Sequence, residues 1–331
     1  MFDTTFFKQR TVLVTGASGF IGSRLCERLS GLGAIVHGVS RGQRKGGAVS
    51  RWWQAELDDE FATRRLVESI APDIIFHLAS FVSGKREMEY VMPAVRSNLL
   101  STLNLLISAT GIACPRIVLT GSLEEPEGDV ATATPASPYA AAKGAASTYA
   151  RMFHSLYGTP VVTARLFMVY GPNQKDHSKL VPYVSLSLLQ GQLPQLMSGT
   201  REVDWIYVDD VIDAYLSLAS KEGIDGETVD VGSGELTSVR RVVDHIADIV
   251  EADVRPDFGS LEDRPFERVR VADVGHAGSL IGWKPKTPLV EGLKQTVDWY
   301  RANVRQSLPG AVANCWGDVP MRYPRDTTSV G

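Results

Sequence analysis

Residues 11–22 read Thr-Val-Leu-Val-Thr-Gly-Ala-Ser-Gly-Phe-Ile-Gly, an apolar run that stops at glycines spaced three residues apart and continues as a helical pattern. Gly16 permits a tight turn, Gly19 has no Cβ to keep a pyrophosphate away, and Gly22 lets the following helix pack closely on the strand. That helix, expected to begin near Ser18, would direct its free N–H groups and positive dipole end at phosphates. The stretch predicts a dinucleotide site, with an ordinary strand-turn-helix as the alternative. Its predicted cofactor contacts are Gly16, Ser18, Gly19, Phe20, Ile21 and Gly22.

Strand and helix patterns alternate beyond this turn, which predicts an α/β protein of the Rossmann type with a doubly wound parallel sheet. The expected strands are 34–39, 73–80 and 116–120, and the expected helices are 61–70 and 90–110. After Gly171 the pattern becomes less regular, with helices expected at 180–190, 209–219 and 238–250. We therefore expect a smaller, mostly helical C-terminal substrate domain. The predicted domains are residues 8–171 with returning segments near 202–232, then 172–201 with 233–305, and a tail at 306–331.

Composition excludes several classes of protein. The 331 residues are 44% hydrophobic and 22% charged, which fits a globular protein, and the net charge of −4 does not favour a nucleic-acid surface. The longest apolar runs have the length of strands, and the first residues lack the apolar stretch of a signal peptide, so we expect a cytoplasmic protein without a membrane span. Cys26, Cys114 and Cys315 are widely spaced, which favours buried reduced thiols over a disulfide framework or a metal site.

The end of the second expected strand indicates which dinucleotide binds. NAD-binding proteins place an acidic residue there to hold the ribose hydroxyls, whereas this chain has Ser40 and Arg41. A carboxylate would repel a 2′-phosphate, but a hydroxyl and a guanidinium would bind it. We therefore favour NADP(H) over NAD(H), the alternative being that Arg41 is a solvated cation of its loop. His77, in the next buried strand, is interpreted as packed at the strand end and not as catalytic.

Three residues could carry acid–base chemistry. Ser122 ends an expected strand, and Tyr139 and Lys143 are neighbours one helical turn apart. A phenol with a pKa near 10 is a poor proton donor or acceptor at neutral pH, and lowering that pKa to about 7 needs roughly 4 kcal/mol. We expect the Lys143 ammonium, with a positively charged nicotinamide, to supply this stabilisation of the phenolate. Ser122 would bond the same substrate oxygen; a solvated helix face is the alternative.

At these residues the chain resembles the extended short-chain dehydrogenases/reductases, specifically the NAD(P)-dependent sugar epimerase/dehydratase family, which acts on nucleotide-diphosphate sugars. The resemblance covers roughly residues 10–302. It is carried by Thr15-Gly16-x-x-Gly19-x-x-Gly22, His77-Leu78-Ala79, Asn98, Ser122, Tyr139-x-x-x-Lys143, the runs 165–172, 204–211 and 231–235, and Gly282-Trp283-x-Pro285.

The resemblance implies site residues. Ser122, Tyr139 and Lys143 would form the catalytic trio, with Lys143 also bonding the nicotinamide ribose. It also implies a homodimer formed through the helices that contain Asn98 and Tyr139. Beyond the glycine turn, the predicted cofactor contacts are Ser40, Arg41, Glu56, Leu57, Leu78, Ala79, Ser80, Asn98, Tyr139 and Lys143.

The substrate end departs from the family pattern. The family commonly has asparagine at Met168 and arginine at Val203, both serving the diphosphate. Arg201 and Arg264 lie where the family places diphosphate-binding arginines, and either could bind a phosphate bidentately or be solvated. The predicted substrate contacts are Arg201, Arg264 and Met168.

The reaction type depends on the residues after Ser122. Family dehydratases have a hydroxyl residue, an acid and a catalytic Glu in sequence, whereas this chain reads Ser122-Leu123-Glu124. Glu124 is therefore a candidate base, but Leu123 cannot donate a proton, and Glu124-Glu125-Pro126 could be a solvated turn.

The pattern Gly121-Ser122-x-Glu124-Glu125 looks most like that of the family's reductases of 4-keto-6-deoxy sugars. We therefore expect an NADP(H)-dependent oxidoreductase of a nucleotide-diphosphate sugar, with reduction of a 4-keto(-6-deoxy) sugar, or its reverse, as the leading reaction. Tyr139 would be the acid/base. The alternatives are a 4-epimerase with resident NAD, a 4,6-dehydratase using Glu124, and a non-catalytic dinucleotide sensor. No metal site, nucleic-acid partner or membrane partner is expected.

Overall fold

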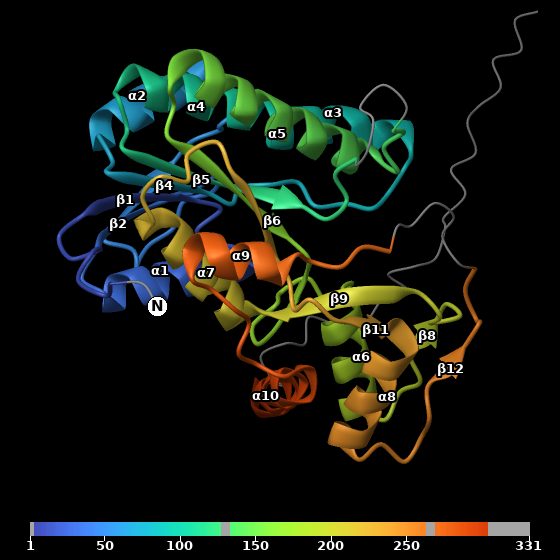
Figure 1. The fold of residues 1–331 in the computed structure, drawn as a ribbon. Coiled ribbons are helices and arrows are strands. Elements are labelled where there is room, and N and C mark those ends of the chain that lie inside the picture. Colours follow the sequence, from blue (N-terminus) through green and yellow to red (C-terminus); the bar gives the residue numbers. More distant parts are fainter. Residues whose placement is uncertain (1–2, 127–132, 263–268, 304–331) are drawn as a thin grey trace, which may run out of the picture.

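The computed structural model describes residues 3–126, 133–262 and 269–303 (Figure 1). The predictions for Arg264, Cys315 and the tail at 306–331 lie outside these residues.

A seven-stranded parallel sheet forms the centre of the molecule, and β1 lies inside it. β1 pairs with β2 on one side and with β4 on the other, with Thr15 opposite both Val39 and His77. The order of strands therefore reverses between β1 and β4, and the carboxyl ends of the strands form a crevice there. The strands, in spatial order, are β10 (Thr228–Val231), β6 (Val161–Leu166), β5 (Arg116–Ser122), β4 (Ile74–His77), β1 (Thr11–Thr15), β2 (Ile35–Ser40) and β3 (Arg51–Gln54).

Helices cover both faces of this sheet (Figure 1). Side chains alternate along β1, so that Val12 and Val14 pack into one apolar cluster and Leu13 into the other, all fully buried. Each such side chain contributes about 1.5–3 kcal/mol by leaving water. On the Val12 face lie α1 (Phe20–Gly31), α7 (Val208–Ser220) and α9 (Val274–Ile281), and on the Leu13 face lie α2 (Glu60–Ile70), α4 (Ser101–Gly111) and α5 (Pro138–Tyr157). The predicted doubly wound sheet is confirmed.

The helix expected over 90–110 is present, but its hydrogen-bond pattern changes along its length. It consists of η1 (Met88–Tyr90), α3 (Val91–Ala94), η2 (Val95–Leu100) and α4. η2 is a π-helical segment that contains Asn98. Such segments occur often at functional sites because the wider turn re-aims its side chains.

The C-terminal half builds a second, smaller unit. β7 (Met168–Tyr170), β9 (Glu202–Tyr207) and β11 (Leu236–Ser238) form a three-stranded sheet, and β8 (Gln195–Leu196) pairs with β12 (Asp257–Phe258). A third apolar cluster joins this sheet to α6 (Leu180–Leu189), α8 (Val239–Val250) and α10 (Leu289–Asn303). The unit is largely helical, as predicted.

The chain passes between the two units more than once. Phe167 alone separates β6 of the main sheet from β7 of the small sheet, and its ring is buried. After β9, which pairs with β7, helix α7 and strand β10 return to the main sheet. The exact domain boundaries remain a prediction.

The turn between β1 and α1 depends on a missing side chain. A Cβ on Gly22 would collide with the Gly16 carbonyl, whereas a Cβ on Gly31 in the same helix would meet nothing. We predict that Gly22→Ala lowers the free energy of unfolding by about 1–3 kcal/mol, since the backbone must move to make room. Gly31→Ala should leave it unchanged or raise it by about 0.5–1 kcal/mol. Urea titration measures both values, and equal effects of the two changes would contradict the argument.

His77 is held neutral inside the fold, as its packed interpretation predicted. Its ring nitrogens lie 2.8 Å from the Thr15 hydroxyl and 3.1 Å from the Thr102 hydroxyl. Burial, with the nearby charge of Lys143, lowers the pKa of His77 from 6.5 to about 3. As pH falls, His77 therefore binds a proton in the unfolded chain at a higher pH than it does in the folded protein.

Stability should decline as pH falls from about 6.5 towards about 3, because the native state excludes the proton that unfolded His77 accepts. We predict that His77→Gln makes this decline shallower, whereas the same change at exposed His276 leaves it as it was. Thermal unfolding followed between pH 7 and pH 5, above the main carboxylate titrations, measures the slope. An unchanged slope in His77→Gln would refute this role of the buried imidazole.

Candidate active site

The turn between β1 and α1 is tight, and two of its glycines occupy special positions in it. Gly16 has φ +68°, in the left-handed region, and Gly19 is the N-cap of α1. A Cβ on Gly16 would lie 2.8 Å from the Ala79 nitrogen, so the chain after β4 packs directly against the turn. The Ala79 N–H donates to the Thr15 hydroxyl at 3.1 Å. The N-terminal end of α1 therefore opens at the crevice between β1 and β4, where it can stabilise an anion.

A cavity of about 300 Å³ lies at this crevice. Ten of the predicted cofactor residues line it: Gly16, Ser18, Gly19, Ser40, Arg41, Glu56, Leu57, Leu78, Ala79 and Ser80. The sequence analysis missed other lining residues, namely Val39, Ala55, Asp58, Phe81, Arg96, Ser97 and Ser101. Arg96 and Ser97 come from the π-helical turn, where the sequence pointed only to Asn98.

The other predicted cofactor residues lie outside the lining. Phe20 and Ile21 pack against apolar clusters, and Gly22 is buried beneath the turn. Asn98 is 1% exposed, and it hydrogen-bonds to residues that form the wall of the cavity. Its side chain accepts from the Ser80 hydroxyl and the Phe81 N–H, both at 2.8 Å, and donates to the Phe81 carbonyl at 3.0 Å. Asn98 thereby fixes the loop that carries Ser80.

Ser40 and Arg41 stand at the rim of the cavity. The Ser40 hydroxyl donates to the Gly42 carbonyl at 2.5 Å, and Gln54 donates to the Arg41 carbonyl at 2.9 Å. These bonds fix the backbone and leave the Arg41 side chain exposed. The end of β2 carries no carboxylate, although Glu56 and Asp58 line the cavity further along.

The three residues expected to carry catalysis come together beside this cavity. Ser122 ends β5 and is 7% exposed. Tyr139 is the second residue of α5, which Ser137 caps by accepting the Ala140 N–H at 3.1 Å. The Ser122 and Ser80 side chains lie close enough to the Tyr139 phenol to lower its pKa. Lys143, one turn along α5, is 5% exposed and donates to the Thr120 carbonyl at 2.8 Å.

The pKa of Tyr139 differs from the expectation. Within the protein it is raised to about 12, chiefly by desolvation and then by the charges of Glu125 and Glu124, although bonds from Ser122 and Ser80 lower it. The expected lowering by Lys143 is not found, because burial outweighs it and lowers the pKa of Lys143 itself to about 8. Tyr139 therefore keeps its proton at neutral pH.

The candidate substrate residues lie in different surroundings. Arg201, before β9, places Nη2 3.5 Å from a carboxylate oxygen of Glu124, with 21% and 30% of the two side chains exposed. Met168 packs on the apolar cluster of the smaller unit, where Val203 is also buried. The two departures from the family pattern thus extend an apolar core. Arg264 lies outside the described residues.

Glu125 overturns the interpretation of the two acids as a solvated turn. It is 6% exposed, and its Oε1 accepts the Ser122 N–H at 2.7 Å. Its position three residues after Ser122 was the only signal in the sequence.

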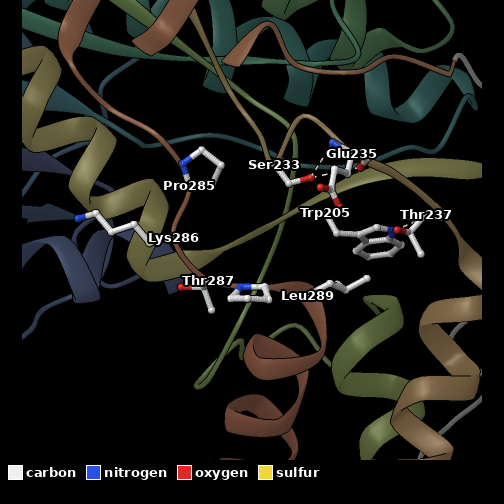
Figure 2. A pocket seen from close by; sticks show the side chains of 9 residues that line it. Trp205, Ser233, Glu235, Thr237, Pro285, Lys286, Thr287 and Leu289 are labelled. Carbon is white, nitrogen blue, oxygen red and sulfur yellow. Dashed lines mark hydrogen bonds between the residues drawn. The ribbon is translucent and has the colours of Figure 1, made fainter. Parts of the chain in front are cut away.

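A second cavity of about 260 Å³ lies between the β9–β11 ladder and the loop before α10, and Figure 2 shows its lining side chains. None of the predicted site residues lines it. Its polar groups bond within the protein: the Trp205 indole donates to the Thr237 carbonyl at 3.1 Å, and the Ser233 hydroxyl to Asp204 at 2.8 Å.

Within the described ranges, no three acidic, histidine or cysteine side chains gather where a metal ion could bind. The helices of those same ranges are also too short or too polar to cross a membrane.

Comparison with known proteins extends this description. The chain is 32% identical over 310 residues to a UDP-glucose 4-epimerase of Mycolicibacterium smegmatis, covering 87% of this chain and 98% of that protein. It is 30% identical over 329 residues to a probable dTDP-glucose 4,6-dehydratase of Sinorhizobium fredii, covering 88% and 93%. The structure of Thermus thermophilus UDP-glucose 4-epimerase in complex with NAD is 28% identical, with a TM-score of 0.76, and covers 88% of this chain and 98% of that one.

A family profile matches residues 12–232, from β1 to the end of β10. This stretch contains the glycine turn, the cavity and the Ser122, Tyr139 and Lys143 side chains. Because the related proteins are enzymes, a non-catalytic sensor is set aside. The chain is an enzyme and belongs to the NAD-dependent epimerase/dehydratase family.

Proposed function

We propose that this enzyme transfers a hydride between NADP(H) and a nucleotide-diphosphate sugar, with reduction of a 4-keto(-6-deoxy) sugar as its main reaction. The observation that carries the proposal is the placement of Tyr139. Its phenol lies beside Ser122 and beside Ser80, which lines the dinucleotide cavity. A proton donor is therefore available beside the cavity where a hydride would be delivered.

The residues of the cavity fit a dinucleotide. The Gly16–Gly19 turn and the α1 N-terminus would hold its pyrophosphate, Lys143 its nicotinamide ribose, and NADPH would supply the hydride. Tyr139 would donate its phenolic proton to the keto oxygen of the sugar, and Ser122 would donate a hydrogen bond to the same oxygen. Asn98 and the Ser80 loop would keep these groups in place while excluding water.

The protonation state of Tyr139 supports reduction as the first step. Reduction needs a protonated acid, and the raised pKa of Tyr139 provides one at neutral pH. Oxidation, which begins both epimerisation and dehydration, needs the phenolate. Dehydration has less support still, because Leu123 is buried and apolar and Glu124 is ion-paired with Arg201.

A 4-epimerase with resident NAD is the second candidate. It is favoured by the relatives, since the M. smegmatis protein is named a UDP-glucose 4-epimerase and the T. thermophilus epimerase was solved with NAD. The same Ser122, Tyr139 and Lys143 would serve that reaction. The two candidates differ in whether the cofactor leaves the enzyme.

A homodimer is also proposed. The helices around Asn98 and Tyr139 expose large apolar side chains, which is typical of a surface that a second copy covers. These side chains are Met92, Leu100, Ile107, Tyr149 and Leu156.

The Tyr139→Phe variant should lose turnover, because it removes only the hydroxyl that protonates the product. We predict a fall in kcat of about 10²- to 10⁴-fold, with NADPH affinity unchanged. NADPH oxidation with UDP- and dTDP-linked 4-keto-6-deoxyglucose measures the rate, and fluorescence titration measures the affinity. Full activity in this variant would remove Tyr139 from the mechanism.

The preference for NADP(H) can be measured without a sugar substrate. We predict that NADPH binds more tightly than NADH and that Arg41→Met weakens NADPH binding by about 10- to 100-fold while leaving NADH binding unchanged. Arg44→Met is the matched control, because Arg44 lies in the same loop but not in the cavity lining. Near-stoichiometric NAD released from denatured protein would instead favour the epimerase.

A further inference from the structure

Glu125 is a buried carboxylate to which the proposed mechanism assigns no task. Only 6% of the residue is exposed, although it follows directly after the partly exposed Glu124. Burying a carboxylate is costly unless hydrogen bonds and opposite charges compensate for lost water. The hydrogen bonds and charges around Glu125 therefore show how its burial is compensated.

The carboxylate joins two elements of the active site. On the strand side, its Oε1 accepts the Ser122 N–H at 2.7 Å, and the Glu125 N–H donates to the Ser122 carbonyl at 3.1 Å. On the helix side, Ser147 of α5 lies close enough to stabilise the carboxylate and lower its pKa. Ser147 lies one turn beyond Lys143 and two turns beyond Tyr139. One side chain thus ties the strand that carries Ser122 to the helix that carries the other two residues.

The residues around the Glu125 carboxylate leave just enough space for it. A Cβ on Gly121 would lie 2.7 Å from Glu125 Oε1, so only glycine at this position of β5 leaves the space. The next residue, Pro126, packs on α5 at Gly144, where a Cβ would lie 2.8 Å from the proline Cδ. The segment from Gly121 to Pro126 is therefore fitted closely against the helix.

The charges around Glu125 are those of the catalytic centre. Lys143 of α5 and Arg165 of β6 favour its ionised form, while burial opposes it and raises its pKa overall. Arg165 is bound to Asp230 of β10 through its Nε at 2.6 Å. Tyr139 and Glu124, itself paired with Arg201, complete the ionisable groups that face it. Arg165 and Arg201 each have a carboxylate within ion-pair distance. Lys143 has none among the described residues, so the charge of Glu125 acts on it from farther away.

We propose that Glu125 is a positioning residue, which holds the backbone of Ser122 and thereby fixes the Ser122 hydroxyl relative to Tyr139, and which sets a negative charge near Lys143. The proposal deepens the proposed function and rests on it for its catalytic part. Glu125 touches no reacting atom. It acts by holding the backbone of Ser122 against α5 and by placing a negative charge near the ammonium group.

Two substitutions separate these effects. Glu125→Gln keeps the shape and an oxygen that can accept the Ser122 N–H, but it removes the charge. Since that charge raises the pKa of Lys143, we expect the pKa to fall below its value of about 8. Lysine ¹³Cε NMR titration measures it, and the Lys143→Arg spectrum assigns the signal. An unchanged Lys143 pKa would overturn the proposal, whether or not any sugar is turned over.

Glu125→Val removes the hydrogen bonds as well. We expect kcat to fall about 10- to 100-fold, with the Kd for NADPH and the KM for the keto sugar little changed, because a misplaced hydroxyl affects the transition state more than binding. Glu125→Gln should recover most of this loss. Wild-type kcat in Glu125→Val would overturn the positioning role.

A matched control addresses stability. Asp225→Asn removes the carboxylate that pairs with Arg116 at 2.6 Å, at the other end of β5. It should lower the melting temperature without changing kcat or the pKa of Lys143. If Glu125→Val does not fold, the Lys143 titration in Glu125→Gln decides the question. If no 4-keto sugar is turned over by the wild type, the proposed function fails while the Lys143 titration still tests Glu125.

Discussion

The tight approach of α1 to β1 is the constraint on which the remaining structure depends. β1 is an inner strand of the sheet, and α1 can leave it at this angle only because Gly22 has no Cβ to strike the Gly16 carbonyl. That angle points the helix N-terminus at the crevice between β1 and β4. The same turn accepts the chain after β4 so closely that Ala79 bonds back to Thr15. The wall of the cavity, and the Ser80 loop that reaches Tyr139, are placed by this packing.

Burial has two opposing effects at the active site. It gives Lys143 and Tyr139 fixed positions, yet it disfavours the charged form of both side chains. A lysine one turn from a tyrosine is therefore not sufficient to make a phenolate. The protein instead surrounds these groups with a carboxylate and several hydroxyls, which makes the protonated tyrosine the resting form. The protonation of Tyr139 and Lys143 thus depends on the neighbouring carboxylate and hydroxyls as much as on the three residues of the motif.

The sequence was informative wherever a local pattern determines structure. The alternation of strand and helix patterns predicted the doubly wound sheet, and the glycine spacing predicted the turn, since each pattern is made by residues near one another in the chain. Glu125 could not be understood in this way, because its burial requires Gly121, Ser147 and Arg165 on three different elements. The contact of Arg201 with Glu124 and the π-helical turn at Asn98 likewise arise from packing that a single sequence does not show.

The single residue between β6 and β7 has a consequence for the motion of the molecule. Because this connection is one residue long and the Phe167 ring is buried in the main core, it is too short and too firmly held to let the two units swing apart. Opening and closing around a substrate must then come from surface loops and side chains, not from a hinge between rigid halves. For the same reason, melting of the smaller unit would uncover one edge of the main core, so we expect both units to unfold in a single cooperative transition.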